Sequence, residues 1–80
     1  MYFYTYVLKS LKEGNLYVGW TNSLKERVTE HNKGLVKSTK SRIPFELVYF
    51  EGCKDKSGAI SREKQLKTGF GRDYLKRRLG

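Results

Sequence analysis

The fold is decided by the stretch YFYTYVL (residues 2–8) and the shorter NLYVG (residues 15–19) that follows it. Aromatic and β-branched residues dominate the first segment and favour a β-strand. Gly14 and Asn15, between the two segments, are residue types that form tight turns. We therefore predict that the two segments pair as a β-hairpin.

The segment TNSLKERVTEHNKG (residues 21–34) predicts the first helix. Asn22 or Ser23 can cap its start, and Ser23 with Glu26 has the spacing of a capping box. Gly34 is typical of a helix end. Residues 35–44 have no helical or strand periodicity and carry several cations, so a basic loop is expected there.

FELVYF (residues 45–50) predicts a third strand. Asp55 or Ser57 can then cap a second helix that runs to about Lys67, and the glycines of residues 69–71 are expected to separate it from a last helix, RDYLKRRL. The predicted fold class is α+β, in the order β-β-α-β-α-α, with a three-stranded antiparallel sheet flanked by helices. We expect residues 1–80 to form a single domain.

Composition points to a polyanionic partner. The chain of 80 residues has 17 Lys and Arg against 8 Asp and Glu, a net charge of +9. Such an excess repels itself, so it favours nucleic acid as the partner over a membrane, for which no long basic amphipathic stretch is present. A basic surface without any partner is the alternative interpretation.

A single cysteine and a single histidine exclude an internal disulfide, a thiolate metal cluster and a His-rich zinc site. The first ten residues, MYFYTYVLKS, are too short and too soon charged for a signal peptide or a membrane span. We expect a cytoplasmic protein.

Three charged or titratable residues fall where core residues are expected. Arg27 and His31 lie on the stripe of the first helix that carries its apolar residues, namely Leu24, Val28 and Leu35. Glu63 lies on the inner side of the second helix, with Ala59, Ile60 and Leu66. Ionised groups at such positions need a partner or a cleft.

The plain interpretation of these residues is a structural Arg27–Glu63 ion pair with His31 filling space. The hairpin adds Tyr6 on its first strand and Tyr17 on its second, both expected to face the helices. Buried tyrosines are usually core residues. Tyrosines grouped with an arginine, a histidine and a glutamate nevertheless form a set that can carry out phosphoryl chemistry.

These residues resemble the motifs of the GIY-YIG nucleases. Tyr4-Thr5-Tyr6 and Tyr17-Val18-Gly19 are similar to the two half-motifs of that family, and Trp20-Thr21 follows the second as expected. Leu24, Arg27 and His31 then lie on a helix, and residues 59–67 (AISREKQLK) resemble the segment that carries a metal-binding glutamate. The resemblance extends over nearly the whole chain, in the family's order.

The resemblance implies hydrolysis of phosphodiester bonds with one Mg2+ or Mn2+ ion. By the same resemblance Tyr6 is the general base or positions the attacking water, and Tyr17 organises the site. Arg27 would steady the scissile phosphate, His31 would tune the tyrosine, and Glu63 would bind the metal. Because the ordinary pKa of tyrosine is about 10, Tyr6 needs positive charge nearby to act as a base.

Two departures from the family pattern bear on activity. Tyr4 stands where the first half-motif has glycine, and no asparagine follows the third strand, where many active members carry one. The alternative to a nuclease is therefore an inactive nucleic-acid-binding module with the same fold. A protein–protein adaptor is a third interpretation, which explains the charge poorly.

The nucleic-acid surface is predicted from the basic loop, the basic last helix and the tryptophan beside the second half-motif. DNA is preferred over RNA as the partner, with structure-directed or weakly specific cleavage. The predicted contact residues are Trp20, Lys33, Lys37, Lys40, Arg42, Arg72, Lys76 and Arg77.

Overall fold

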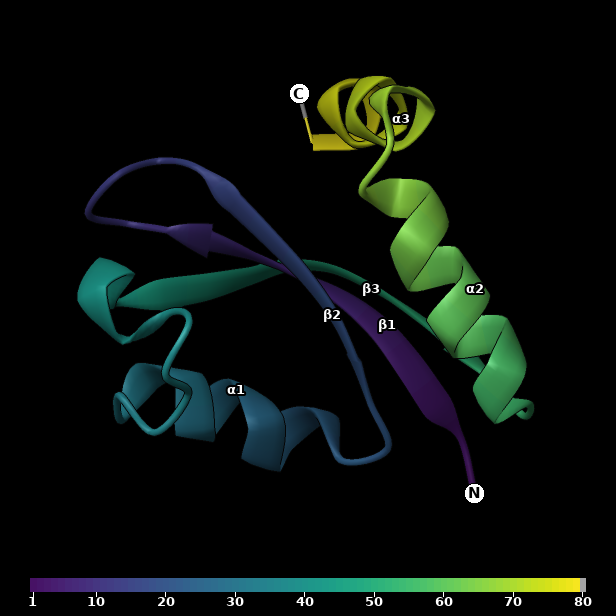
Figure 1. Cartoon of the computed structure of the whole chain (residues 1–80), viewed down its shortest axis with the longest axis horizontal. Coiled ribbons are helices and arrows are strands. Elements are labelled where there is room, and N and C mark those ends of the chain that lie inside the picture. The colour runs from purple at the N-terminus through teal and green to yellow at the C-terminus, as the bar shows by residue number, and fades with distance from the viewer. Residues whose placement is uncertain (80) are drawn as a thin grey trace.

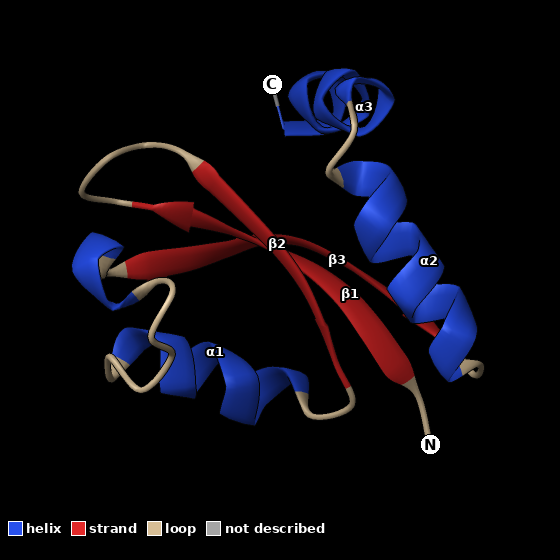
Figure 2. Cartoon of the chain, in the orientation of Figure 1, coloured by secondary structure: helices blue, strands red, loops and turns tan. Residues whose placement is uncertain are grey.

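The structure is a computed structural model and describes residues 1–79. It confirms the predicted fold class, an α+β arrangement of one antiparallel sheet and three α-helices, and adds a short 3-10 helix (Figure 2). No helix among these residues is both long and apolar enough to cross a membrane. In chain order the elements are β1 (Phe3–Ser10), β2 (Leu16–Thr21), α1 (Leu24–Asn32), η1 (Lys40–Arg42), β3 (Phe45–Cys53), α2 (Lys56–Leu66) and α3 (Gly69–Leu79).

The central strand of the sheet is β1, because the strand order is β2-β1-β3 and both pairings are antiparallel. Each strand continues beyond the C-terminal end of its predicted segment: β1 to Ser10, β2 to Thr21 and β3 to Cys53. Helix α1 packs against one face of the sheet, and α2 leads to α3 on the other side (Figure 1). Side chains alternate along β1, so neighbouring residues serve different faces.

Each face of the sheet has its own apolar core. On the α1 face, Tyr6 and Leu8 are buried with Phe45, and Leu24 and Val28 of α1 pack against them as predicted. On the α2 and α3 face the buried residues are Val7, Val18, Leu66 and Leu75. The prediction for Leu35 was wrong: this side chain is 70% exposed, because α1 ends at Asn32 and the chain turns away before reaching it.

Both ends of α1 differ in detail from the simplest prediction. Ser23 occupies the N-cap position, but its hydroxyl bonds the Asn22 side chain instead of a helix amide, so the capping box does not form within residues 1–79. The end at Gly34 is confirmed, and its φ of 74° suits glycine. At the end of the helix, Asn32 bonds both the carbonyl and the amide of Phe45, at 3.1 and 2.6 Å, and thereby ties α1 to β3.

The glycines at residues 69–71 do not break the helices, contrary to the prediction. They form the first turn of α3, and the break falls at Lys67 and Thr68, where the Thr68 carbonyl accepts from the Arg72 amide. Gly71 is needed for close packing instead: a Cβ atom there would lie 2.3 Å from the Leu66 backbone. The glycine thus allows α3 to start directly against the end of α2.

Candidate active site

Tyr6 stands at the centre of the candidate site. It lies on β1 directly opposite Gly19 of β2, and its side chain is only 1% exposed. A Cβ atom on Gly19 would lie 2.6 Å from the Tyr6 hydroxyl oxygen. The missing side chain of Gly19 therefore leaves the space that the tyrosine hydroxyl occupies, and this gives the glycine of the second half-motif a physical role.

His31 of α1 is fully buried and is held through both ring nitrogens. Its Nε2 lies 2.9 Å from the Tyr6 hydroxyl, and its Nδ1 lies 2.8 Å from the hydroxyl of Thr39. Burial, and to a smaller extent the nearby charge of Arg27, lowers the pKa of His31 to about 4. The imidazole is consequently neutral near pH 7.

Tyr17 completes an aromatic group around the histidine. The centre of its ring lies 5.0 Å from that of His31 and 6.4 Å from that of Tyr6. The guanidinium of Arg42 lies over the Tyr17 ring at 6.0 Å. Residues predicted from two strands and one helix are thus brought together, with a cation of the basic loop above them.

Arg27 borders this group and faces an open hollow. Its guanidinium forms an ion pair with Glu30 at 3.0 Å. The hollow has a volume of about 490 Å³ and is also lined by Trp20 and Lys56, whose ammonium lies 5.4 Å from the centre of the indole ring. The Arg27–Glu63 ion pair of the plain interpretation does not form within residues 1–79.

Glu63 approaches from the opposite side of the sheet, on α2. It is half-buried, with its side chain 17% exposed, and Ala59 and Leu66 beside it are buried as predicted. Its carboxylate pairs with Lys67 at 2.9 Å. Burial raises the pKa of Tyr6 above its ordinary value. The neighbouring Arg27 lowers this pKa and the charges of Tyr17 and Glu63 raise it, so these groups belong to one electrostatic environment.

A metal ion can be held here only with few protein ligands. Residues 1–79 contain no group of three or more His, Cys, Asp and Glu side chains placed to hold one. A lone, half-buried carboxylate such as Glu63 suits Mg2+, which keeps several waters and shares phosphate oxygens of the substrate. The donor set therefore fits a magnesium ion that binds together with a substrate.

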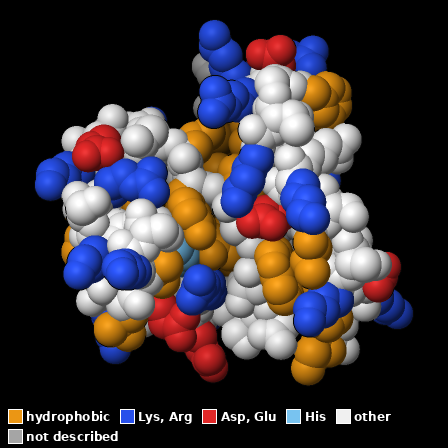
Figure 3. All heavy atoms as spheres, viewed as in Figure 1, with side chains coloured by type: hydrophobic (Ala, Val, Ile, Leu, Met, Phe, Trp, Pro, Cys, Tyr) orange, Lys and Arg blue, Asp and Glu red, His pale blue; other side chains and the backbone are white. Residues whose placement is uncertain are grey.

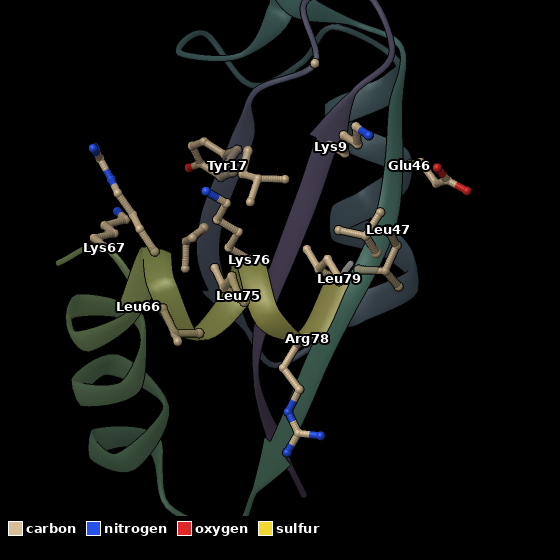
Figure 4. A pocket seen from close by; sticks show the side chains of 15 residues that line it. Lys9, Tyr17, Glu46, Leu47, Leu66, Lys67, Leu75, Lys76, Arg78 and Leu79 are labelled. Carbon is tan, nitrogen blue, oxygen red and sulfur yellow. The ribbon is translucent and has the colours of Figure 1, made fainter. Parts of the chain in front are cut away.

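The predicted nucleic-acid residues fall into separate groups. The residues Lys33, Lys37 and Lys40 are exposed near the end of α1, and Arg42 is half-buried. Arg72 and Lys76 line an open groove of about 1030 Å³ between α3 and the sheet, whereas Arg77 does not line it (Figure 4). Positive side chains lie on both sides of the hollowed centre of the face drawn in Figure 3.

Two residues of the site escaped the sequence analysis. Thr39 lies in the loop after α1, where no periodicity marks a position as buried, yet it is fully buried against His31. Glu30 was not assigned a role from the sequence, yet it pairs with Arg27 three positions before it while its side chain stays 46% exposed. The i, i+3 spacing was the only signal available for that pair.

Fold and site together define a catalytic domain of the GIY-YIG type. The model of the GIY-YIG catalytic domain family matches residues 2–78, and the chain belongs to this family. A UPF0213 protein of Clostridium perfringens is 48% identical over 65 residues, which cover 80% of this chain and 69% of that protein.

Further relatives carry the same family name. A UPF0213 protein of Haloquadratum walsbyi is 41% identical over 68 residues, covering 84% of this chain and 75% of that protein. The solution structure of the UPF0213 protein of Bacillus halodurans is similar with a TM-score of 0.57 and 31% identity, over 94% of this chain and 82% of that one. The shared fold therefore extends over nearly the whole chain.

Proposed function

We propose that this protein is a metal-dependent endonuclease that hydrolyses phosphodiester bonds in DNA by a one-metal mechanism. Cleavage would be directed by DNA structure or by weak sequence preference, in repair or processing of DNA in the cytoplasm, with residues 1–80 acting as one catalytic domain. The observation that carries the proposal is the contact of 2.9 Å between the Tyr6 hydroxyl and a neutral His31, beside the guanidinium of Arg27.

In this proposal the residues divide the work of an in-line displacement. Tyr6 takes a proton from the attacking water, while Arg27 and His31 favour the phenolate form that makes this possible. Tyr17 holds the imidazole in place through ring contact. Arg27 binds the scissile phosphate and opposes the charge that grows in the transition state, once Glu30 releases it.

Glu63 would hold the metal ion, which supplies charge neutralisation and polarises a phosphate oxygen when bound. The carboxylate must first exchange its contact with Lys67 for the metal. Binding of the bare protein to Mg2+ is expected to be weak for this reason, and to strengthen when a phosphate contributes further oxygen ligands.

The test is cleavage of end-labelled single-stranded, duplex, flap and branched DNA with Mg2+ or Mn2+. Wild type, Glu63→Ala and the charge-matched control Asp73→Ala, an exposed residue of α3, are compared. We expect Asp73→Ala to cut like the wild type. We expect Glu63→Ala to bind but to cut none of the DNAs.

An inactive nucleic-acid-binding module is the second candidate. It is supported by the absence of an asparagine after β3, and Asn32 on α1 is already used to tie that helix to β3. If wild type and Glu63→Ala bind DNA equally with steep salt dependence and neither cuts, this function replaces the nuclease.

A further inference from the structure

Thr39 has no part in the roles described so far, although it is one of the fully buried polar residues. It lies in the loop between α1 and η1, with its hydroxyl oxygen 2.8 Å from Nδ1 of His31. The other ring nitrogen of His31 contacts the Tyr6 hydroxyl. Thr39, His31 and Tyr6 therefore form a buried chain of three hydrogen-bonding groups.

The direction of this chain depends on where the single hydroxyl proton of Thr39 points. Among residues 1–79 the only other acceptor in reach is the carbonyl of Val36, at 3.4 Å, which is longer than the usual ~2.5–3.0 Å for such bonds. That carbonyl already accepts from the amides of Thr39 and Lys40, both at 3.0 Å. The Thr39 hydroxyl is therefore better placed to donate its hydrogen bond to Nδ1 of His31, and Nδ1 then acts as an acceptor.

We propose that Thr39 is a positioning residue that holds His31 as the Nε2–H tautomer, so that the imidazole donates its hydrogen bond to the Tyr6 oxygen. A neutral imidazole carries one ring proton, and an Nδ1 that accepts from Thr39 leaves this proton on Nε2. The opposite direction would rest on the long contact from Thr39 to Val36.

The direction matters for the tyrosine. A donor aimed at the Tyr6 oxygen stabilises the phenolate, and the Arg27 guanidinium acts in the same sense, against burial and the charge of Glu63. In the opposite direction Tyr6 would donate its own proton to His31 and would be a poorer acceptor for a proton from water. The catalytic consequence rests on the proposed function, whereas the tautomer of His31 does not.

The tautomer can be read directly, because His31 is the only histidine in the chain. Long-range 1H–15N correlation spectra of 15N-labelled protein at pH 7 distinguish protonated Nε2 from protonated Nδ1. We expect protonated Nε2 in wild type and in Thr39→Ser, which keeps the hydroxyl. In Thr39→Val we expect the proton to be shared between the two tautomers, so that Nε2 no longer appears as the one protonated nitrogen. The isosteric control is Thr29→Val on exposed α1 surface, whose spectrum should match the wild type.

Single-turnover DNA cleavage by the same proteins gives the second readout. We expect about a tenfold loss in Thr39→Val, the size of one hydrogen bond to a charged group, and recovery in Thr39→Ser. A protonated Nδ1 in wild type, or an unchanged Nε2–H tautomer in Thr39→Val, would overturn the proposal. A third result separates the two proposals. If Thr39→Val loses the Nε2–H tautomer but the wild type cuts no DNA, the role of Thr39 is upheld and the nuclease function is rejected.

Discussion

Two clusters of tyrosines and charged residues lie on opposite faces of the same sheet, and they differ in how completely their charges are paired. In the first, on the α1 face, Tyr6 contacts a neutral imidazole and lies beside a guanidinium. The carboxylate nearest to Arg27 is Glu30, on the same helix, and no carboxylate bonds Tyr6 itself within residues 1–79. Within these residues the proton of the Tyr6 hydroxyl is therefore not held by a carboxylate.

The second cluster joins β3 to α2 and α3. Tyr49 donates to Glu51 and contacts the Tyr74 hydroxyl, and the Arg62 guanidinium binds both oxygens of Glu51 at 3.1 Å and lies over the Tyr74 ring. Burial, together with its bond to Glu51, moves the pKa of Tyr49 far above the ordinary value. Every strong donor here has an acceptor within the cluster.

The comparison separates two uses of the same residue types. Where a carboxylate accepts from the tyrosine and from an arginine, the network is closed and holds the helices in place. Where a tyrosine meets only donors and a neutral ring, the network is open and suits proton transfer.

Removing one tyrosine hydroxyl from each cluster should show the difference between the two clusters most clearly, in the rate of DNA cleavage. We expect Tyr6→Phe to lower the rate of DNA cleavage by roughly 10²–10⁴-fold, the usual contribution of a general base, with little change in DNA binding. Tyr49→Phe is expected to cut within about threefold of wild type, since it lies outside the site. Equal losses in the two variants, measured in single-turnover assays, would contradict the distinction.

The first cluster, which contains His31, should also make the free energy of unfolding depend on pH. The pKa of His31 is about 4 in the folded protein and about 6.5 when unfolded, so the unfolded chain takes up a proton first as pH falls. The free energy of unfolding should therefore decrease between pH 6.5 and 4, by up to roughly 3 kcal/mol from this residue.

Urea unfolding at pH 7 and pH 4.5 checks this, with His31→Gln as the variant that cannot titrate. Carboxylates with lowered pKa, such as Glu51 beside Arg62, also lose stabilisation in acid, but they do so equally in both proteins. The difference between the two proteins isolates the histidine. An identical pH dependence in wild type and His31→Gln would show that His31 is not buried as a neutral ring.

Removing an arginine from the second cluster should lower the free energy of unfolding and leave the rate of DNA cleavage unchanged. Arg62→Met removes the bonds from Arg62 to Glu51 and leaves that half-buried carboxylate without a cation, with the Tyr49 hydroxyl as its remaining donor in the cluster, which is expected to cost about 1–2 kcal/mol of unfolding free energy. DNA cleavage at low temperature should stay near the wild-type rate. A loss of cleavage in a protein that is still folded by circular dichroism would place Arg62 in the active site instead.

The smallest effect is expected at Glu63, the proposed metal ligand. The ion pair between the exposed Lys67 and the half-buried Glu63 lies at the surface, where such pairs are worth about 0.2–1 kcal/mol, so its removal in Lys67→Met should tighten Mn2+ binding by about two- to fivefold. Calorimetric titration with Mn2+ measures this, and Lys64→Met on the same helix is the matched control. Equal affinities for Lys67→Met and Lys64→Met would mean that Lys67 does not compete for the carboxylate.

The sequence predicted most of the fold because its elements are locally marked. Alternation, glycines and apolar stripes identified the strands and helices, and the inward positions of His31 and Glu63 followed from the same periodicity. The rest depended on contacts between distant residues. Sequence periodicity does not indicate such features, because loop paths and rotamers are set by tertiary packing. Examples are the burial of Thr39, the packing role of Gly71 and the pairing of Glu30 with Arg27.

The pairing of Tyr6 with Gly19 links the hairpin's register to its chemistry. A slip of β2 by one residue would place Val18 or Trp20 opposite the tyrosine and turn Tyr17 toward the other face of the sheet. Insertions or deletions in the connecting residues 11–15 can therefore be accommodated only when they leave this alignment unchanged. Relatives with longer hairpin loops are compatible with the same site, whereas any change that shifts the alignment would remove it without altering a single site residue.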